Sequence, residues 1–295
     1  GLSTVAGTTT AAGTITTTDT NLDIAALVIT DTTTITAGAA TITLAAVTGG
    51  SNALTLIGDE IEITAAIAGT GAISLRPTVN LAIAIGGGGG TGALDLTVAE
   101  IGRIADGHAS ITIGRAATGT HAIVVNAITF NDPTTIQAPA GAGSILVAGV
   151  ITGAGDASIT LDGPSETTTF NNSAGISTAN ADITITDNVV LASGATVILD
   201  TGTGAGNISI TGTIGGAGGA ESLTLISGTG TTTVTGAVGG GLETLILQEN
   251  AASSTGAVTF NGDVTLTALT TFAQGHAVVL NENAAITNDV TFLNT

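Results

Sequence analysis

The chain has 295 residues, with 22 acidic side chains against three arginine or lysine residues, and its formal net charge is −19 at pH 7. Proteins that bind nucleic acid draw affinity from lysine and arginine, so this charge argues against that class. No run approaches the ~20 consecutive apolar residues of a membrane-spanning helix, and we expect no membrane insertion.

The N-terminal part of the chain, 1–85, consists of short strand-like segments. Apolar residues alternate with polar ones at 41–44, 53–58, 61–64 and 72–75. A period of two is typical of a strand with one buried face. Gly, Asn and Asp between the segments favour tight turns. We therefore predict a β-solenoid segment over residues 1–85.

Residues 86–107 depart from this pattern. Five glycines stand at 86–90, and Thr97 precedes Glu100 by three positions, which is the spacing of a capping box. The sequence predicts a helix of about two turns within 97–107. The glycine run lacks the lysine of a phosphate-binding loop, so we expect a Gly-rich loop and a short helix between two solenoid segments.

From residue 108 to residue 295 one short phrase recurs, an apolar–Thr/Ser–apolar triplet framed by turn residues. Its copies begin at Ile159, Ile183, Ile208, Leu223 and Leu245, at intervals of 24, 25, 15 and 22 residues. Repeats of about twenty residues with two or three strands each predict an all-β fold, a parallel β-helix or β-solenoid with about 20–25 residues per coil. Each copy of the phrase then forms the same wall in a different coil. The chain is expected to make about 14 coils over roughly 65 Å.

Four carboxylates flank the inward strands at predicted corners, and they are the candidate metal ligands: Asp156, Asp162, Asp182 and Asp187. Two such side chains from adjacent coils could hold Ca²⁺, whose ligands are oxygen atoms. Solvated turn acids are the alternative interpretation. We expect no other cofactor.

Other polar residues give little sign of chemistry. His108, His121 and His276 are far apart in the sequence and are interpreted as polar residues at turns. Arg76 and Arg115 are also widely separated, so the mixed Asp/Arg cluster of a polysaccharide-cleaving β-helix enzyme is not expected. The sequence therefore predicts a chain that is not an enzyme and has no catalytic residues.

Threonine-rich segments raise a further possibility, because Thr-x-Thr on a flat solenoid face is the chemistry of ice binding. Such segments occur at 14–18, 32–36 and 231–235. They do not recur at a constant interval, and a flat array needs regularity. The sequence thus argues against an ice-binding face.

The repeats carry a resemblance to a known family. The stretch 96–163, followed by "GNISITGTIGG", "ESLTLISGTGTTTVTGAVGG" and "VTFNGDVTLTALTTF", resembles the repeat regions of large secreted bacterial exoproteins of the filamentous-haemagglutinin, two-partner-secretion type, and more loosely autotransporter passengers. The similarity is clearest over 93–295. It implies a right-handed parallel β-helix, an extracellular or outer-surface location on a bacterium, and a role in adhesion or in a surface fibre.

Three functions remain open. The leading hypothesis is a non-catalytic structural rod whose partners are copies of itself or further solenoid of a longer parent chain, since 1–10 and 286–295 look like continuing strands. The second is a surface that binds glycans or divalent cations through loops such as 86–92 and 115–121, although Trp and Tyr for stacking on sugars are lacking. The third is a polysaccharide-active β-helix enzyme.

Overall fold

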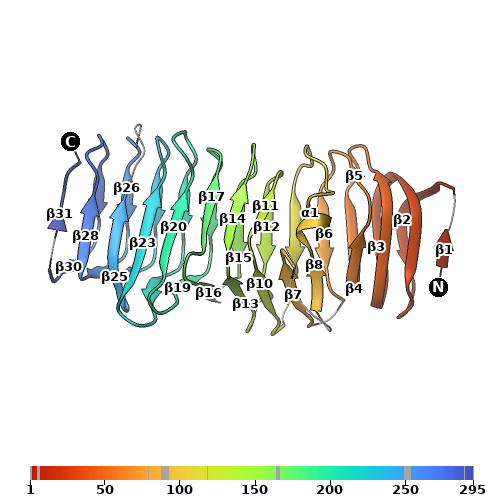
Figure 1. Ribbon diagram of the computed structural model, residues 1–295, viewed down its shortest axis with the longest axis horizontal. Helices are drawn as coiled ribbons and strands as arrows, with labels where there is room; N and C mark the ends of the chain where they lie inside the picture. Colours follow the sequence, from red (N-terminus) through yellow and green to blue (C-terminus); the bar gives the residue numbers. More distant parts are fainter. Residues whose placement is uncertain are drawn as a thin grey trace.

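The chain folds into a single row of parallel β-coils that runs from the N-terminus to the C-terminus (Figure 1). A computed structural model describes residues 2–4, 7–78, 80–87, 93–117, 119–163, 167–248, 254–288 and 290–294. The structure is the β-solenoid that the sequence predicts, with about 11 turns. Within the described ranges, none of the helical structure is long and apolar enough to cross a membrane.

Three walls of hydrogen-bonded parallel strands form the solenoid. Sheet 1 has fourteen strands, in the order β1 (Leu2–Thr4), β3 (Leu22–Thr48), β4 (Leu54–Ile63), β6 (Ile73–Arg76), β9 (Ile111–Gly114), β12 (Thr134–Gln137), β15 (Ile159–Asp162), β18 (Ile183–Ile185), β21 (Ile208–Ile210), β24 (Thr232–Val234), β26 (Val258–Phe260) and β29 (Val278–Leu280), with β2 (Thr9–Thr16) and β5 (Ile67–Ala68) also paired to β3.

The other two walls are shorter. Sheet 2 has seven strands: β8 (Ala93–Leu96), β7 (Ala82–Ile85), β10 (Ala122–Val125), β13 (Ser144–Val147), β16 (Thr167–Phe170), β19 (Asn188–Leu191) and β22 (Ile214–Gly216). Single bridges through Val238 connect it to the pair β27 (Val264–Leu266) and β30 (Ala284–Ile286). Sheet 3 has eight strands: β11 (Ile128–Phe130), β14 (Val150–Gly153), β17 (Gly175–Thr178), β20 (Thr196–Asp200), β23 (Glu221–Ile226), β25 (Leu242–Leu247), β28 (Ala268–Thr271) and β31 (Val290–Thr291).

Coil length varies along the rod. Leu54 pairs with Ile73, whereas Ile73 pairs with Ile111, which lies twice as far along the chain. Residues 77–110 therefore leave sheet 1 and return, and they contain β7, β8 and the helix α1 (Val98–Ile101). This excursion and the longer central coils explain why the prediction of about 14 coils is wrong. At roughly 4.8 Å per strand, about 11 turns give a stack about 50 Å long.

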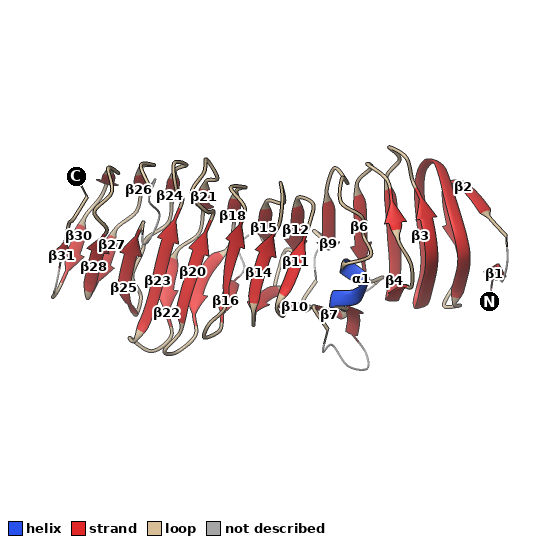
Figure 2. Cartoon of the chain, turned by 45° about the horizontal axis from the view of Figure 1, so that its top comes forward, coloured by secondary structure: helices blue, strands red, loops and turns tan. Residues whose placement is uncertain are grey.

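The capping box of α1 is confirmed, but the helix is shorter than predicted. The backbone N–H of Thr97 donates to Glu100 Oε2 at 2.8 Å, and the Glu100 N–H donates to Thr97 Oγ1 at 3.3 Å. The helix makes one turn, seen in blue in Figure 2, and ends at Gly102. Ile104, which fits the helical spacing, instead forms a β-bridge with Ile67 and is 2% exposed. The helix therefore stops after one turn, because Ile104 is buried in the wall of the solenoid instead of continuing the helix.

Aliphatic side chains fill the interior in continuous stacks. Ile159, Ile183 and Ile208 pair one above another in sheet 1 and are fully buried, as the repeat predicted. Leu223 and Leu245 lie in sheet 3, so the prediction that they share this wall is wrong. The short interval between Ile208 and Leu223 marks a step from one wall to another. Each buried aliphatic side chain contributes about 1.5–3 kcal/mol to stability.

Asp and Asn side chains bind the coils together at the corners. Asp182 Oδ1 accepts the backbone N–H of Asn207 in the next coil at 2.7 Å, and Asn207 Oδ1 accepts that of Thr231 one coil further at 2.9 Å. Asn188 accepts the N–H of Thr213 in the same way at 3.0 Å. These bonds satisfy donors where the sheet ladder is interrupted at a turn.

Candidate functional site at the corners and outer faces

Asp162 and Asp187, two of the four candidate metal ligands, meet at the corner between sheets 1 and 2. The hydroxyl of Thr186 lies 2.9 Å from Asp162 Oδ1 and 3.2 Å from Asp187 Oδ1. Asp187 also accepts the Gly163 N–H at 2.5 Å and the Thr168 hydroxyl at 2.6 Å. Protein donors thus occupy the carboxylate of Asp187, which is 1% exposed.

Burial controls the titration of this corner. Burial is the largest effect, and it raises the pKa of Asp187 above its ordinary value. The negative charge of Asp162 acts in the same direction. The hydrogen bonds from Thr168, Gly163 and Thr186 act in the opposite direction, because they stabilise the ionised carboxylate. Gly163 packs closely against this carboxylate, because a Cβ at this position would lie 2.9 Å from Asp187 Oδ2 and would displace it. The arrangement is that of a buried structural carboxylate held by donors from the preceding coil.

Asp156 and Asp182, the other two candidates, line a shallow hollow at a different corner. Ser158 and Asn180 share its walls. Asp182 is already engaged by the N–H and the side-chain amide of Asn207, at 2.7 and 3.1 Å. Across the described ranges, no three His, Cys, Asp or Glu side chains are grouped so as to hold a metal ion.

The three histidines are buried rather than exposed at their turns. His108 is 6% exposed and places its ring nitrogens 2.9 Å from the Gly71 carbonyl oxygen and 3.3 Å from that of Ile67. His121 and His276 are each 4% exposed, and burial lowers the pKa of both, with the charge of Arg115 adding to this effect at His121. Each histidine lies in a separate coil.

Arg76 and Arg115 lie in adjacent coils despite their separation in the sequence. Arg76 ends β6 and Arg115 follows β9, and these two strands pair directly. Arg115 donates to the Thr78 carbonyl oxygen at 3.0 Å. The sequence argument from their separation was therefore wrong, because neighbouring coils bring distant residues together. Of the loops proposed for ligand binding, residues 88–92 and residue 118 lie outside the described residues.

An acidic cluster beside α1 has no counterpart in the sequence interpretation. Burial and then the negative charge of Glu100 raise the pKa of Glu62. Burial also raises the pKa of Glu60, to which the charges of Glu62 and Glu100 contribute. Glu100 is 3% exposed and accepts the Ile63 N–H at 3.2 Å. Its capping role could be predicted, but its approach to these distant positions of β4 could not.

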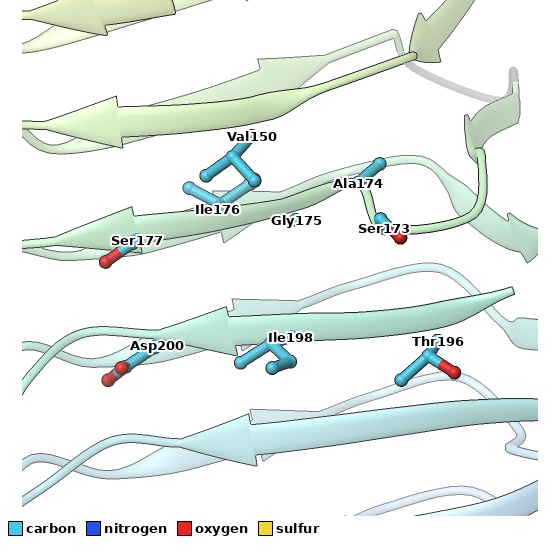
Figure 3. A pocket seen from close by; sticks show the side chains of 9 residues that line it. All are labelled: Val150, Ser173, Ala174, Gly175, Ile176, Ser177, Thr196, Ile198 and Asp200. Atoms are coloured by element: carbon cyan, nitrogen blue, oxygen red, sulfur yellow. The ribbon is translucent and has the colours of Figure 1, made fainter. Parts of the chain in front are cut away.

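A groove crosses the outer face of sheet 3. Val150 and Ile198 are 42% and 44% exposed and stand on strands either side of Gly175 (Figure 3). A Cβ at Gly175 would collide with the Ile198 carbonyl oxygen. The groove has a volume of about 440 Å³, and none of its lining residues is aromatic: Val150, Ser173, Ala174, Gly175, Ile176, Ser177, Thr196, Ile198 and Asp200.

Hydroxyl side chains line up along the outer face of sheet 1. The in-register partners form one unbroken column, here called the hydroxyl column: Thr14, Thr34, Thr55, Ser74, Thr112, Thr135, Thr160, Thr184, Ser209, Thr233 and Thr259. The expectation that uneven intervals prevent a regular array is therefore wrong. Loops at the corners absorb the differences in coil length, and the sheet sets the spacing.

The outer face of sheet 2 is different. Its central outward column, here called the aliphatic column, consists of Val124, Leu146, Thr169 and Val190. All four are half-buried between neighbours, as are most members of the hydroxyl column. The central outward column of this wall is thus mostly aliphatic, unlike that of sheet 1.

Comparison with known proteins identifies no relative. No protein-family model, no curated protein and no solved structure matches the chain.

Proposed function

We propose that this chain is a non-catalytic structural segment of a secreted bacterial cell-surface adhesin or extracellular fibre, in which it forms a rigid rod. The observation that carries the proposal is the aliphatic core, which continues from Leu22 to Leu269 through successive coils. A core of this kind contacts neighbouring coils only, so it sets the length of the rod and resists bending. The resemblance of the repeats to secreted exoproteins supports the extracellular location.

The final coil favours self-association as the mode of assembly. Val290, Phe292 and Leu293 are 44%, 51% and 48% exposed, whereas Phe260 one coil earlier is fully buried. Strands β29 and β31 each pair with a strand on one side. The outer edges of such parallel strands, with apolar neighbours, are templates for another strand, so a coil of a second copy or of the same parent chain fits here.

The acidic side chains at the corners repel those of a second rod that approaches from the side. A net charge of −19 opposes lateral bundling of copies at low salt. Association through the coil ends places fewer of these charges against one another. We therefore propose end-to-end stacking, with lateral bundling only when salt or a divalent cation such as Ca²⁺ screens the charge.

Electron microscopy of the purified chain, with and without calcium, tests this function. We expect rods about 50 Å long, or multiples of that length joined end to end. Solution scattering should give an elongated particle, and the symmetric distribution of interatomic distances that a sphere produces would contradict the rod. Hydrolysis of acidic polysaccharides by the purified chain would contradict the non-catalytic role.

A further inference from the structure

The hydroxyl column is two residues wide in the coils of β18, β21 and β24, as it also is where Thr14 and Thr16 of β2 pair with Thr34 and Thr36 of β3. In the coils of β18, β21 and β24 a second hydroxyl residue follows two positions later, which pairs Thr184 with Thr186, Ser209 with Thr211, and Thr233 with Thr235. The backbone ladder continues through these positions, because the Thr211 N–H donates to the Ile185 carbonyl at 2.9 Å and the Thr235 N–H donates to that of Ile210 at 2.8 Å. Two columns of three hydroxyl residues therefore form a rectangular array, here called the hydroxyl array.

The spacing of this array is set by the sheet. Neighbouring strands lie about 4.7–4.9 Å apart, and alternate residues along a strand lie about 6.6–6.8 Å apart. Five of the six side chains are threonine, which has a stiff χ1 torsion because it is branched at Cβ. The array thus holds methyl and hydroxyl groups in fixed positions before any ligand arrives, which lowers the entropy lost on binding.

Its hydroxyls are mostly not used inside the protein. Thr186 donates to the carboxylate corner, but in the described part of the chain the hydroxyls of Thr184, Ser209 and Thr233 make no side-chain hydrogen bond. The outer face of sheet 3 also carries in-register hydroxyls, at Thr129, Thr152 and Ser177, but that run meets Asp200 in the next strand, whereas the hydroxyl column of sheet 1 continues through its coils. The hydroxyls of the array are therefore available to an external partner.

The charge pattern restricts that partner. The six residues of the array are uncharged in a chain of net charge −19, and a second copy would bring the same negative charge to the rim. Stacking on sugar rings needs aromatic side chains, and the array has none. What fits an uncharged, rigid lattice of hydroxyl and methyl groups is a surface of ordered water.

We propose that the hydroxyl array binds the surface of ice. Ice presents oxygen atoms in rows with fixed repeats, and the array presents its groups in rows that also have fixed repeats, set by the strand spacing and by the alternation along each strand. Waters held between the methyl groups and hydrogen-bonded to the hydroxyls join the ice lattice, so the face adsorbs to the crystal without a change in the fold. This activity goes beyond a structural rod and does not depend on it.

Partition into slowly growing ice tests the proposal, with ice as the only probe. The variant with Thr184→Lys and Ser209→Lys places two charges in adjacent coils of the array. The matched control carries Thr169→Lys and Val190→Lys in adjacent coils of sheet 2. We expect the wild-type chain and the control to enter the ice and to slow its recrystallisation, and the array variant to be excluded like an inert protein.

Three results would overturn the proposal: exclusion of the folded wild-type chain from ice, equal loss of incorporation in both double-lysine variants, or binding to insoluble neutral polysaccharide that the array variant alone loses. Circular dichroism verifies the fold of each chain. If the array variant does not fold, a variant with Thr184→Val and Thr233→Val replaces it. These changes keep the side-chain shape and remove two hydroxyls, and unchanged partition into ice would then contradict the proposal.

Discussion

The outer faces of sheet 1 and sheet 2 differ in chemistry, although the same coils build both. Their inward residues are interchangeable aliphatics, such as Ile183 in sheet 1 and Val189 in sheet 2, both buried. The outward neighbours are Thr184 on one wall and Val190 on the other. Inward positions are determined by the shared core, which is filled mostly by branched aliphatics. Outward positions are free of this constraint, so the two faces differ for reasons outside the core.

The largest expected effect comes from breaking the shared core. Ile208→Asp places a charge in the continuous aliphatic stack of sheet 1, where Ile208 is fully buried. We expect a loss of at least ~3 kcal/mol in the free energy of unfolding, because an unpaired buried charge is poorly solvated. Urea unfolding followed by circular dichroism measures this loss.

Thr211→Asp is the matched control, since Thr211 is exposed on the outer face three positions later. It should change the free energy of unfolding by less than about 0.5 kcal/mol. Equal losses in the two variants would show that the strands do not have one buried and one exposed face.

A smaller effect is expected at the corner that separates the two faces. Asp187→Ala leaves the Thr168 hydroxyl and the Gly163 N–H without their acceptor. An unsatisfied buried donor costs about 1–3 kcal/mol. Thermal unfolding should show this loss, whereas Asp156→Ala, at an exposed turn, should be close to neutral. A neutral Asp187→Ala variant would exclude a structural role for this carboxylate.

The same carboxylate predicts a pH dependence. Burial raises the pKa of Asp187 in the folded state above its ordinary value of 3.8. Folding therefore favours the protonated form, and the contribution to stability is complete below pH 3.8 and is lost as pH rises through the folded-state pKa. Asp187→Asn, which cannot ionise, should lack this loss.

Unfolding free energies across a pH series measure the difference between the wild-type chain and the Asp187→Asn variant. The wild-type chain should become less stable relative to the variant as pH rises from 3.8. Parallel curves for the two chains would contradict the assignment of this pH dependence to Asp187.

The smallest effect is expected from exchanging the two outer faces. Thr184→Val and Val190→Thr swap the outward residues of one coil without touching the core. Each should change the free energy of unfolding by less than about 0.5 kcal/mol. A loss above about 1 kcal/mol in either variant would mean that the outer columns contribute to stability rather than only to surface chemistry.

Local patterns made much of this fold predictable from sequence. The alternation around Ile183 indicated a strand with one buried face, and Thr97 with Glu100 indicated the start of the helix. The wall to which a strand belongs was not predictable, because Ile208 in sheet 1 and Leu223 in sheet 3 stand in the same local pattern. The shortened interval between these two residues was the available signal.

The corner network was harder to predict for a different reason. Asp187 and Thr168 are far apart in the sequence, and their contact depends on the length of a coil. One signal was present: Thr168 occupies an inward position in "TTTF", where an aliphatic residue is otherwise expected. A polar residue at an inward position predicts a buried partner. The hydroxyl column was missed because regularity was sought along the sequence rather than between strands.

The central claim is that the hydroxyl column advances by one strand spacing per coil, whatever the number of residues in that coil. The chain has no cysteine, so spin labels can be attached at introduced cysteines without other changes. One doubly labelled chain carries Thr112→Cys and Ser209→Cys, four strands apart in sheet 1, and another carries Thr112→Cys and Thr259→Cys, six strands apart. Pulsed dipolar spectroscopy should give label separations centred near ~19 Å and ~29 Å, at roughly 4.8 Å per strand. Separations that do not increase by about 10 Å between the two chains, or that are spread over tens of ångströms, would contradict the in-register stack.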